Sequence, residues 1–237
     1  MRKTSIRAAA GLAACALCAR ALLAADAAPA LREFRIGDAW GRDTVEFRTS
    51  ASLEDIVGTT NIVRGVLKAD PAHLKETASA RIEVDVRTLK TGVEMRDGAV
   101  GRALGGDKSP AAVFTLEKVT SASAESLEPN APVDLTAEGT LELKGVKKPV
   151  TVSARVSYVP KGGPFSRMRP GNFVKLTASF DLKLADFGVE RNGPVLPLQV
   201  SETAKVTVTV LASDASAEEA KTYRENAVKY LGKAIVE

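Results

Sequence analysis

Few residues in this chain could do chemistry. His73 is the only histidine among the 237 residues, and it follows Pro71 in a polar stretch where we expect a solvated surface side chain. A serine or cysteine nucleophile needs a histidine base, and a zinc site needs three or four clustered ligands. Neither arrangement can be built around one histidine in such a stretch. The sequence also contains no GxSxG, HExxH, Walker or GxGxxG motif.

Carboxylates are plentiful, but their spacing favours a structural interpretation. Glu83 and Asp85, like Glu138 and Glu142, alternate with apolar residues, as the solvent-facing side of a β-strand does. A pair of this kind is weak evidence for general acid–base catalysis. The sequence therefore predicts a protein that is not an enzyme, uses no cofactor and binds no metal.

Residues 1–28 have the features of a secretory signal peptide. Arg2, Lys3 and Arg7 form a basic start, a short apolar run follows, and Ala25-Asp26-Ala27 offers a cleavage site. The segment Leu12–Cys15 resembles a lipoprotein cleavage box, but cleavage there would leave an unusually short signal followed by apolar residues. We therefore expect a periplasmic or secreted protein, with lipid anchoring at Cys15 as the less favoured alternative.

Removal of this segment changes the charge and the cysteine content. It takes away four basic side chains, one acidic side chain and both cysteines, Cys15 and Cys18, so the remainder carries a net charge of about +1. Such a balance does not indicate a nucleic-acid partner. Without cysteine, neither a disulfide nor a thiolate metal site is expected.

The elements that must position any site are β-strands. In residues 135–143 every second residue is apolar or Gly139, and residues 150–156 resume this period of two. We expect a hairpin that reverses at Gly145, with Lys147 and Lys148 at its polar tip and Pro149 opening the second strand. Further strands are expected at residues 31–36 and 44–50 (one strand interrupted at 37–43), 57–70, 78–89, 111–120, 173–184 and 200–211. Seven or eight such strands predict an antiparallel sheet closed as a barrel or folded as a sandwich.

Three segments depart from this pattern. Residues 90–110 form a long glycine-rich connection, which is more often functional than accidental, and residues 161–171 form a basic loop. Residues 218–235 have helical spacing after a capping box formed by Ser216 and Glu219. This amphipathic helix could pack on the barrel or contact a partner. We divide the chain into a signal peptide (1–28), a β-barrel (31–213) and a C-terminal helical extension (214–237).

The interior of the sheet remains as the place for a function. Its inward residues are aliphatic, with Phe47, Phe114 and Phe180 added. An eight-stranded barrel is either filled by such side chains or lined by them around one ligand. The periodicity does not separate these cases, and on the periodicity alone a filled core is favoured.

A family resemblance shifts that balance. Residues 139–152, GTLELKGVKKPVTV, resemble the signature hairpin of the YceI-like, polyisoprenoid-binding family. Residues 178–189, ASFDLKLADFGV, resemble its later strand and corner, and Thr91-Gly92 with Arg96-Asp97 resembles its T-G-x-x-x-R-D loop. Gly58 and Gly65 are similar to its early glycines, so the resemblance extends from about residue 34 to residue 211.

The chain also departs from the family pattern. Thr60 and Val63 replace aromatic residues, Glu142 replaces a threonine, and Gly98-Ala99 replaces an acid and a histidine. Residues 103–106 and 109–110 lack the usual aromatics. Smaller side chains imply a wider pocket or a different lipid tail.

The resemblance implies an all-β, antiparallel, lipocalin-like barrel of about eight strands with an isoprenoid or other amphiphilic lipid in its interior. The residues expected to line the interior are Val45, Phe47, Ile82, Val84, Val86, Phe114, Leu116, Leu141, Leu143, Phe180, Leu182 and Leu184. Those expected at the mouth are Arg96, Asp97, Arg167 and Arg169. A homodimer is possible, and the alternative is an interaction module with a filled barrel whose C-terminal helix docks a protein.

Overall fold

The structure is a computed structural model that describes residues 30–162, 170–191 and 200–232. The expected signal peptide lies outside these residues, as do Arg167 and Arg169. Within them the chain forms one sheet of ten strands. The strands are β1 (Arg32–Ile36), β2 (Thr44–Ser50), β3 (Asp55–Thr60), β4 (Val63–Ala69), β5 (Ser79–Asp85), β6 (Ala111–Ala122), β7 (Pro132–Leu143), β8 (Val146–Val159), β9 (Phe173–Lys183) and β10 (Thr203–Ser213).

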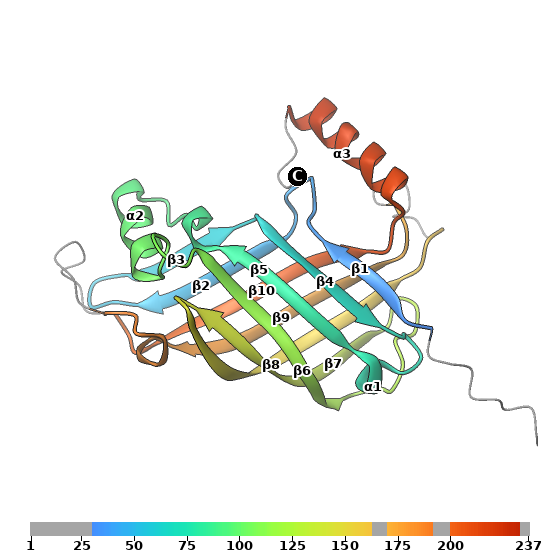
Figure 1. The fold of residues 1–237 in the computed structure, drawn as a ribbon, viewed down its shortest axis with the longest axis horizontal. Coiled ribbons are helices and arrows are strands. Elements are labelled where there is room, and N and C mark those ends of the chain that lie inside the picture. Colours follow the sequence, from blue (N-terminus) through green and yellow to red (C-terminus); the bar gives the residue numbers. More distant parts are fainter. Residues whose placement is uncertain (1–29, 163–169, 192–199, 233–237) are drawn as a thin grey trace, which may run out of the picture.

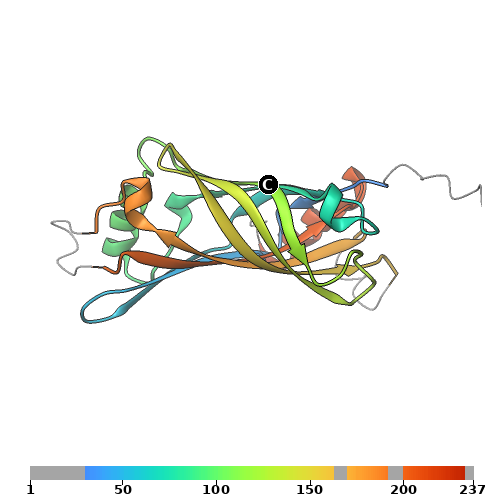
Figure 2. The ribbon, with the colours of Figure 1, turned by 90° about the horizontal axis from the view of Figure 1, so that it is seen from below.

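The ten strands make an eight-stranded antiparallel barrel because two of the barrel strands are interrupted. β1 and β2 follow one another along β10, while β4 and β3 follow one another along β1 and β2. The remaining strands pair in chain order from β5 to β10, and the pairing of β1 with β10 closes the sheet. The expected closed barrel is confirmed, and its elongated shape is visible in Figures 1 and 2.

The break between β1 and β2 is stabilised by two buried carboxylates. Asp43 accepts hydrogen bonds from the backbone N–H of Leu211 at 2.8 Å and from that of Asp38 at 2.9 Å. Arg42 donates to Asp38 in turn. Buried backbone donors need hydrogen-bond partners. The Asp43 carboxylate therefore accepts the hydrogen bond from β10 at the point where the neighbouring strand is absent.

The central hairpin reverses at Gly145 as expected, but its second strand begins at Val146 and not at Pro149. Leu143 pairs with Val146, so the turn consists of Lys144 and Gly145, with φ values of 56° and 77°. Positive φ at both central positions is typical of a two-residue turn whose twist matches that of the strands. The expectation that Lys147 and Lys148 form the tip is therefore wrong: both lie in β8, opposite Glu142 and Leu141.

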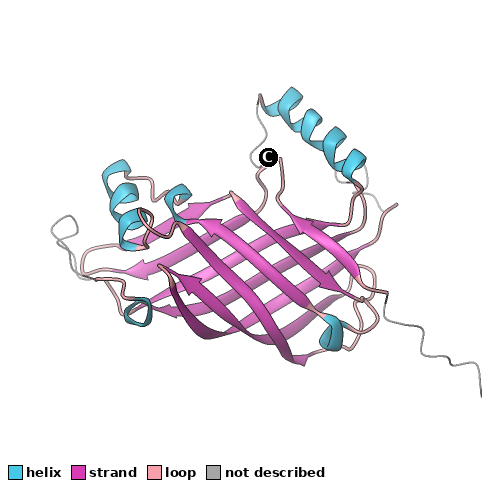
Figure 3. Ribbon diagram, viewed as in Figure 1, coloured by secondary structure: helices cyan, strands magenta, loops and turns pink. Residues whose placement is uncertain are grey.

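Short helices lie at the two ends of the barrel, and strand and helix content are mapped in Figure 3. α1 (Leu74–Thr77) lies at one end and α2 (Glu94–Ala103) at the other, as both views show (Figures 1 and 2). α2 occupies the long glycine-rich connection, in which no helical period was evident. Short 3₁₀ turns at Val86–Thr88 and Leu184–Phe187 end the expected strands early.

The C-terminal helix α3 (Ala217–Leu231) lies outside the barrel wall (Figure 1). It begins at the expected capping box, in which Ser216 Oγ accepts from the N–H of Glu219 and Glu219 accepts from the N–H of Ser216. It contacts the 37–43 break, where the Trp40 ring lies 6.0 Å from that of Tyr223 and 6.3 Å from that of Tyr230.

Among the described residues, no helix has the length and apolar character required to cross a bilayer.

Candidate functional site

The described residues contain no cluster of three or more histidine, cysteine or acidic side chains that could hold a metal ion. The single histidine has a structural role. His73 Nδ1 lies 3.0 Å from Asp70 Oδ2, and this hydrogen bond holds the pKa of Asp70 below its usual value. Asp70 also accepts from the N–H groups of Ala30 and Ala72. These contacts tie down the turn before α1.

The interior of the barrel, which we call the bore, contains two clusters of buried apolar side chains. The cluster near α1 includes Phe34, Val63 and Val210, which are at most 1 % exposed. The cluster near α2 includes Leu143, Leu184 and Phe187. The bore is therefore packed from both ends by different residues.

Two cavities lie within these clusters. The α2-side cavity has a volume of about 170 Å³. The α1-side cavity has a volume of about 130 Å³. An engineered cavity of about 150 Å³ with similar lining binds benzene, so each cavity accepts an apolar group of roughly that size. The bore is neither filled completely nor open as one wide tunnel.

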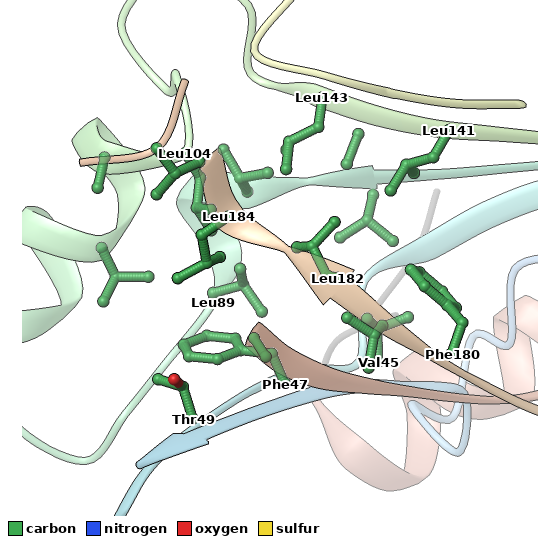
Figure 4. A pocket seen from close by; sticks show the side chains of 18 of the residues that line it. Val45, Phe47, Thr49, Leu89, Leu104, Leu141, Leu143, Phe180, Leu182 and Leu184 are labelled. Atoms are coloured by element: carbon green, nitrogen blue, oxygen red, sulfur yellow. The ribbon is translucent and has the colours of Figure 1, made fainter. Parts of the chain in front are cut away.

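Almost all of the lining is apolar. Thr49 and Glu190 are the polar residues of the α2-side cavity, and Lys68 and Ser79 are those of the α1-side cavity. Glu190, Lys68 and Ser79 are exposed to solvent, so they mark where the cavities approach the surface. Figure 4 labels side chains of the α2-side cavity, which come from strands such as β2, β7 and β9 and, for Leu89, Leu104 and Leu184, from the segments that connect the strands.

Two glycines allow aromatic rings to lie along the barrel wall. A Cβ atom on Gly58 would lie 2.1 Å from Phe47 Cε1, and one on Gly139 would lie 2.6 Å from Phe114 Cζ. Each ring therefore occupies the space that a side chain on the neighbouring strand would take. Because both rings lie against the wall and are only half-buried, space remains beside them.

The structure places all twelve residues expected to line the bore at one of the two cavities. Leu116 lines the α1-side cavity, and the other eleven line the α2-side cavity. Ile82, Phe114 and Phe180 line both. Whether these side chains contact a lipid stays a prediction.

Sequence reasoning missed several lining residues. Val100, Ala103 and Leu104 close the α2-side cavity from α2 and the residue after it, in a segment without periodicity. Val206 and Val208 on β10 follow the same alternation as the predicted residues, so they could have been found. Phe34, Leu67 and Leu74 of the α1-side cavity come from short elements whose inward face was less evident.

Arg96 and Asp97 lie on α2 and are not among the lining residues of either cavity. Arg96 Nη1 lies 2.8 Å from Glu54 Oε1, beside the turn between β2 and β3. Asp97 accepts from the N–H and the hydroxyl of Thr91 at 2.6 and 2.7 Å, and the backbone hydrogen bond lowers the pKa of Asp97 most. These contacts attach α2 to the barrel, and a direct role in ligand binding stays a prediction.

The central hairpin (residues 139–152) and the later strand and corner (residues 178–189) meet at the α2 end of the barrel. Lys144, in the turn of the central hairpin, donates from Nζ to the carbonyl oxygen of Gly188 at 2.6 Å. Gly105, which has a φ of 91°, lies against the same turn, since a Cβ atom there would be 3.0 Å from Lys144 Cα. A larger residue at position 105 would both strain the backbone and displace the connection.

A family model for the YceI-like domain matches residues 40–212. The chain belongs to the YceI-like family. This YceI-like chain resembles solved structures that share its fold at low sequence identity. No curated protein matches it significantly.

Three solved structures illustrate the likeness of the YceI-like chain. A polyisoprenoid-binding domain from Saccharophagus degradans, implicated in plant cell wall breakdown, is 16% identical with a TM-score of 0.59, over 78% of this chain and 99% of that one. BcnA from Burkholderia cenocepacia is 19% identical with a TM-score of 0.56, over 74% and 99%. The YceI protein of Campylobacter jejuni is 18% identical with a TM-score of 0.53, over 68% and 85%.

Proposed function

We propose that this protein binds the apolar tail of an isoprenoid or another long-chain lipid in its bore, outside the cytoplasm and without catalysis. The observation that carries the proposal is the pair of apolar cavities inside a closed barrel, lined almost entirely by aliphatic and aromatic side chains. Burial of hydrocarbon is worth about 0.8 kcal/mol for each methylene. A tail can therefore bind by burial alone, with polar groups near the surface setting its orientation.

Two further observations support this ligand class. The solved domain from Saccharophagus degradans is described as polyisoprenoid-binding, and its fold resembles that of this chain. Among the described residues, the few polar groups at the cavities are the hydroxyls of Thr49 and Ser79 and the exposed Glu190 and Lys68. Such a lining suits hydrocarbon and would leave a buried charged group without partners.

The test is to purify the protein from a lipid-producing host and to measure its mass under native conditions, with solvent extraction of the same sample. We expect an excess mass that corresponds to a lipid and disappears after extraction. Leu182→Gln places an unpaired amide in the α2-side cavity and should lower lipid occupancy. Lys183→Gln, on the exposed face of the same strand, is the matched control and should retain it. A ligand-free mass for the gently purified protein would contradict the proposal.

The proposed location rests on the N-terminal sequence. Cell fractionation, followed by N-terminal sequencing of the mature protein, should recover it outside the cytoplasm with a new terminus after Ala27 or Ala28. A mature protein that begins at a lipid-modified Cys15 would replace this interpretation with membrane anchoring. An unprocessed protein in the cytoplasm would contradict it.

The second candidate function is a protein-interaction module. It is favoured by α3, on which Tyr230 remains 68% exposed and Val228 50% exposed. Deletion of residues 216–237 distinguishes the two functions, because loss of partner binding or of a homodimer with lipid binding intact would favour the module. Sedimentation of the full and shortened chains measures the dimer directly.

A further inference from the structure

We propose that Phe114 and Phe180 determine how much of an apolar tail the bore accepts, so that these two residues set the chain-length specificity. This inference rests on the proposed lipid-binding function. A tail that fills the α2-side cavity buries about one to two isoprene units, given the size of ligand that a comparable cavity holds. The remaining units of a longer tail stay outside the bore.

The two cavities share four lining residues: Ile82, Phe114, Phe180 and Val208. These residues, which we call the partition, lie where the two apolar clusters meet. A tail that enters from the α2 end must pass the partition to reach the α1-side cavity. On this proposal the partition is the point at which burial of the tail stops.

The partition residues come from opposite walls of the bore. Ile82 on β5 pairs with Phe114 on β6, while Phe180 and Val208 lie on the neighbouring strands β9 and β10. The barrel has eight strands when β1–β2 and β3–β4 each count as one. In that closed order two strands, β7 and β8, separate β6 from β9, and two, β1–β2 and β3–β4, separate β10 from β5. The two phenylalanine rings thus approach the bore from opposite directions.

The space beyond the partition exists because small residues line it. Ala137, Ala154 and Ala178, on three adjacent strands, all line the α1-side cavity. This cavity could bury more of a tail if the partition were removed. Since each buried methylene is worth about fourfold in Kd, one further isoprene unit should strengthen binding by at least about tenfold.

The experiment measures the Kd values of prenol, geraniol, farnesol and geranylgeraniol, each one isoprene unit longer than the last, by displacement of an apolar fluorophore. For the full chain we expect affinity to rise up to geraniol and then to stay level. Phe114→Ala and Phe180→Ala should each extend the rise to farnesol or beyond, by at least about tenfold in Kd.

Phe47→Ala is the matched control. It also removes a half-buried ring, but Phe47 lines the α2-side cavity alone. It should alter the affinity for short prenols without changing the length at which affinity stops rising. Ala178→Phe, which fills the α1-side cavity, should abolish the extension when combined with Phe114→Ala.

Three outcomes would overturn the inference. The first is that the full chain binds geranylgeraniol at least about tenfold more tightly than geraniol. The second is that Phe47→Ala changes the length preference in the same way as the partition variants, and the third is that no variant changes the length preference. Phe114→Leu and Phe180→Leu keep the interior packed and provide the same test if the alanine variants unfold. Failure of every prenol to bind any variant or the full chain would instead contradict the proposed function itself.

Discussion

The two ends of the bore are closed in different ways. At the α1 end the side chains of the barrel close the bore around the smaller cavity: Phe34 is 1 % exposed and packs edge-on against Tyr158 at a centroid distance of 6.4 Å. At the α2 end a separate helix closes the barrel, and polar contacts at the surface hold it in place. The difference indicates that stability resides mainly at the α1 end, whereas ligand entry requires least disruption at the α2 end.

The largest expected effect is a difference in the free energy of unfolding between the alanine variants of two phenylalanines, one at each end of the bore. Phe34→Ala should lower the free energy of unfolding by about 3–5 kcal/mol, the usual cost of removing a buried phenylalanine. Phe47→Ala should cost less than half as much, because its ring is only half-buried whereas that of Phe34 is 1 % exposed. Urea denaturation monitored by circular dichroism measures both, and equal costs would contradict the difference between the ends.

A smaller effect concerns local opening. Amide hydrogens of α2 should exchange at least about tenfold faster than those of β4 and β10, because few buried apolar contacts hold the helix. Hydrogen exchange followed by mass spectrometry tests this. Lipid should protect α2 more than β4, and uniform protection of the whole chain would show that the α2 end does not open independently.

Acid should weaken the attachment of α2. The hydrogen bonds from Thr91 lower the pKa of Asp97, so the folded state favours its charged form. This stabilisation is complete above the ordinary aspartate pKa and is lost as the pH falls through the lowered value, below about pH 4. The protection factors of α2 amides, which correct for the intrinsic pH dependence of exchange, should therefore fall a few-fold in this range. Asp97→Asn should show the faster exchange already at neutral pH and lose most of the pH dependence.

Asp70 provides the control for that prediction at the opposite end. His73 lowers its pKa by hydrogen bonding, so acid should also loosen the turn before α1. Asp97→Asn should leave this second response intact. Simultaneous loss of both responses would mean that the variant unfolds the barrel and does not act locally.

The smallest effect on the bore is expected from α3, which lies outside it. Lys161, donating a hydrogen bond at 2.7 Å, and the contacts within the capping box lower the pKa of Glu219 to about 2. Ser216→Ala removes the cap and should destabilise the helix by about 1 kcal/mol. Prenol affinities and exchange of α2 should not change. A change in either would show that α3 is coupled to the bore.

The sequence alone determined the wall of the barrel. A period of two decides which face of a strand is apolar, so all twelve lining positions followed from alternation and the order of the strands. The break at residues 37–43 and the capping box at Ser216 could also be predicted, because each depends on residues that are close together in the sequence. The family resemblance resolved the choice between barrel and sandwich.

Only the tertiary structure decided how the wall encloses space. Alternation states that Phe114 points inward, but the position of its ring depends on Gly139 on the next strand and on Phe180 on the opposite wall. α2 has no period to read because the barrel end and the hairpin turn, and not a continuous apolar stripe, hold it in place. Inward direction is a local property of a strand, whereas the width of the bore is set by residues distant in sequence.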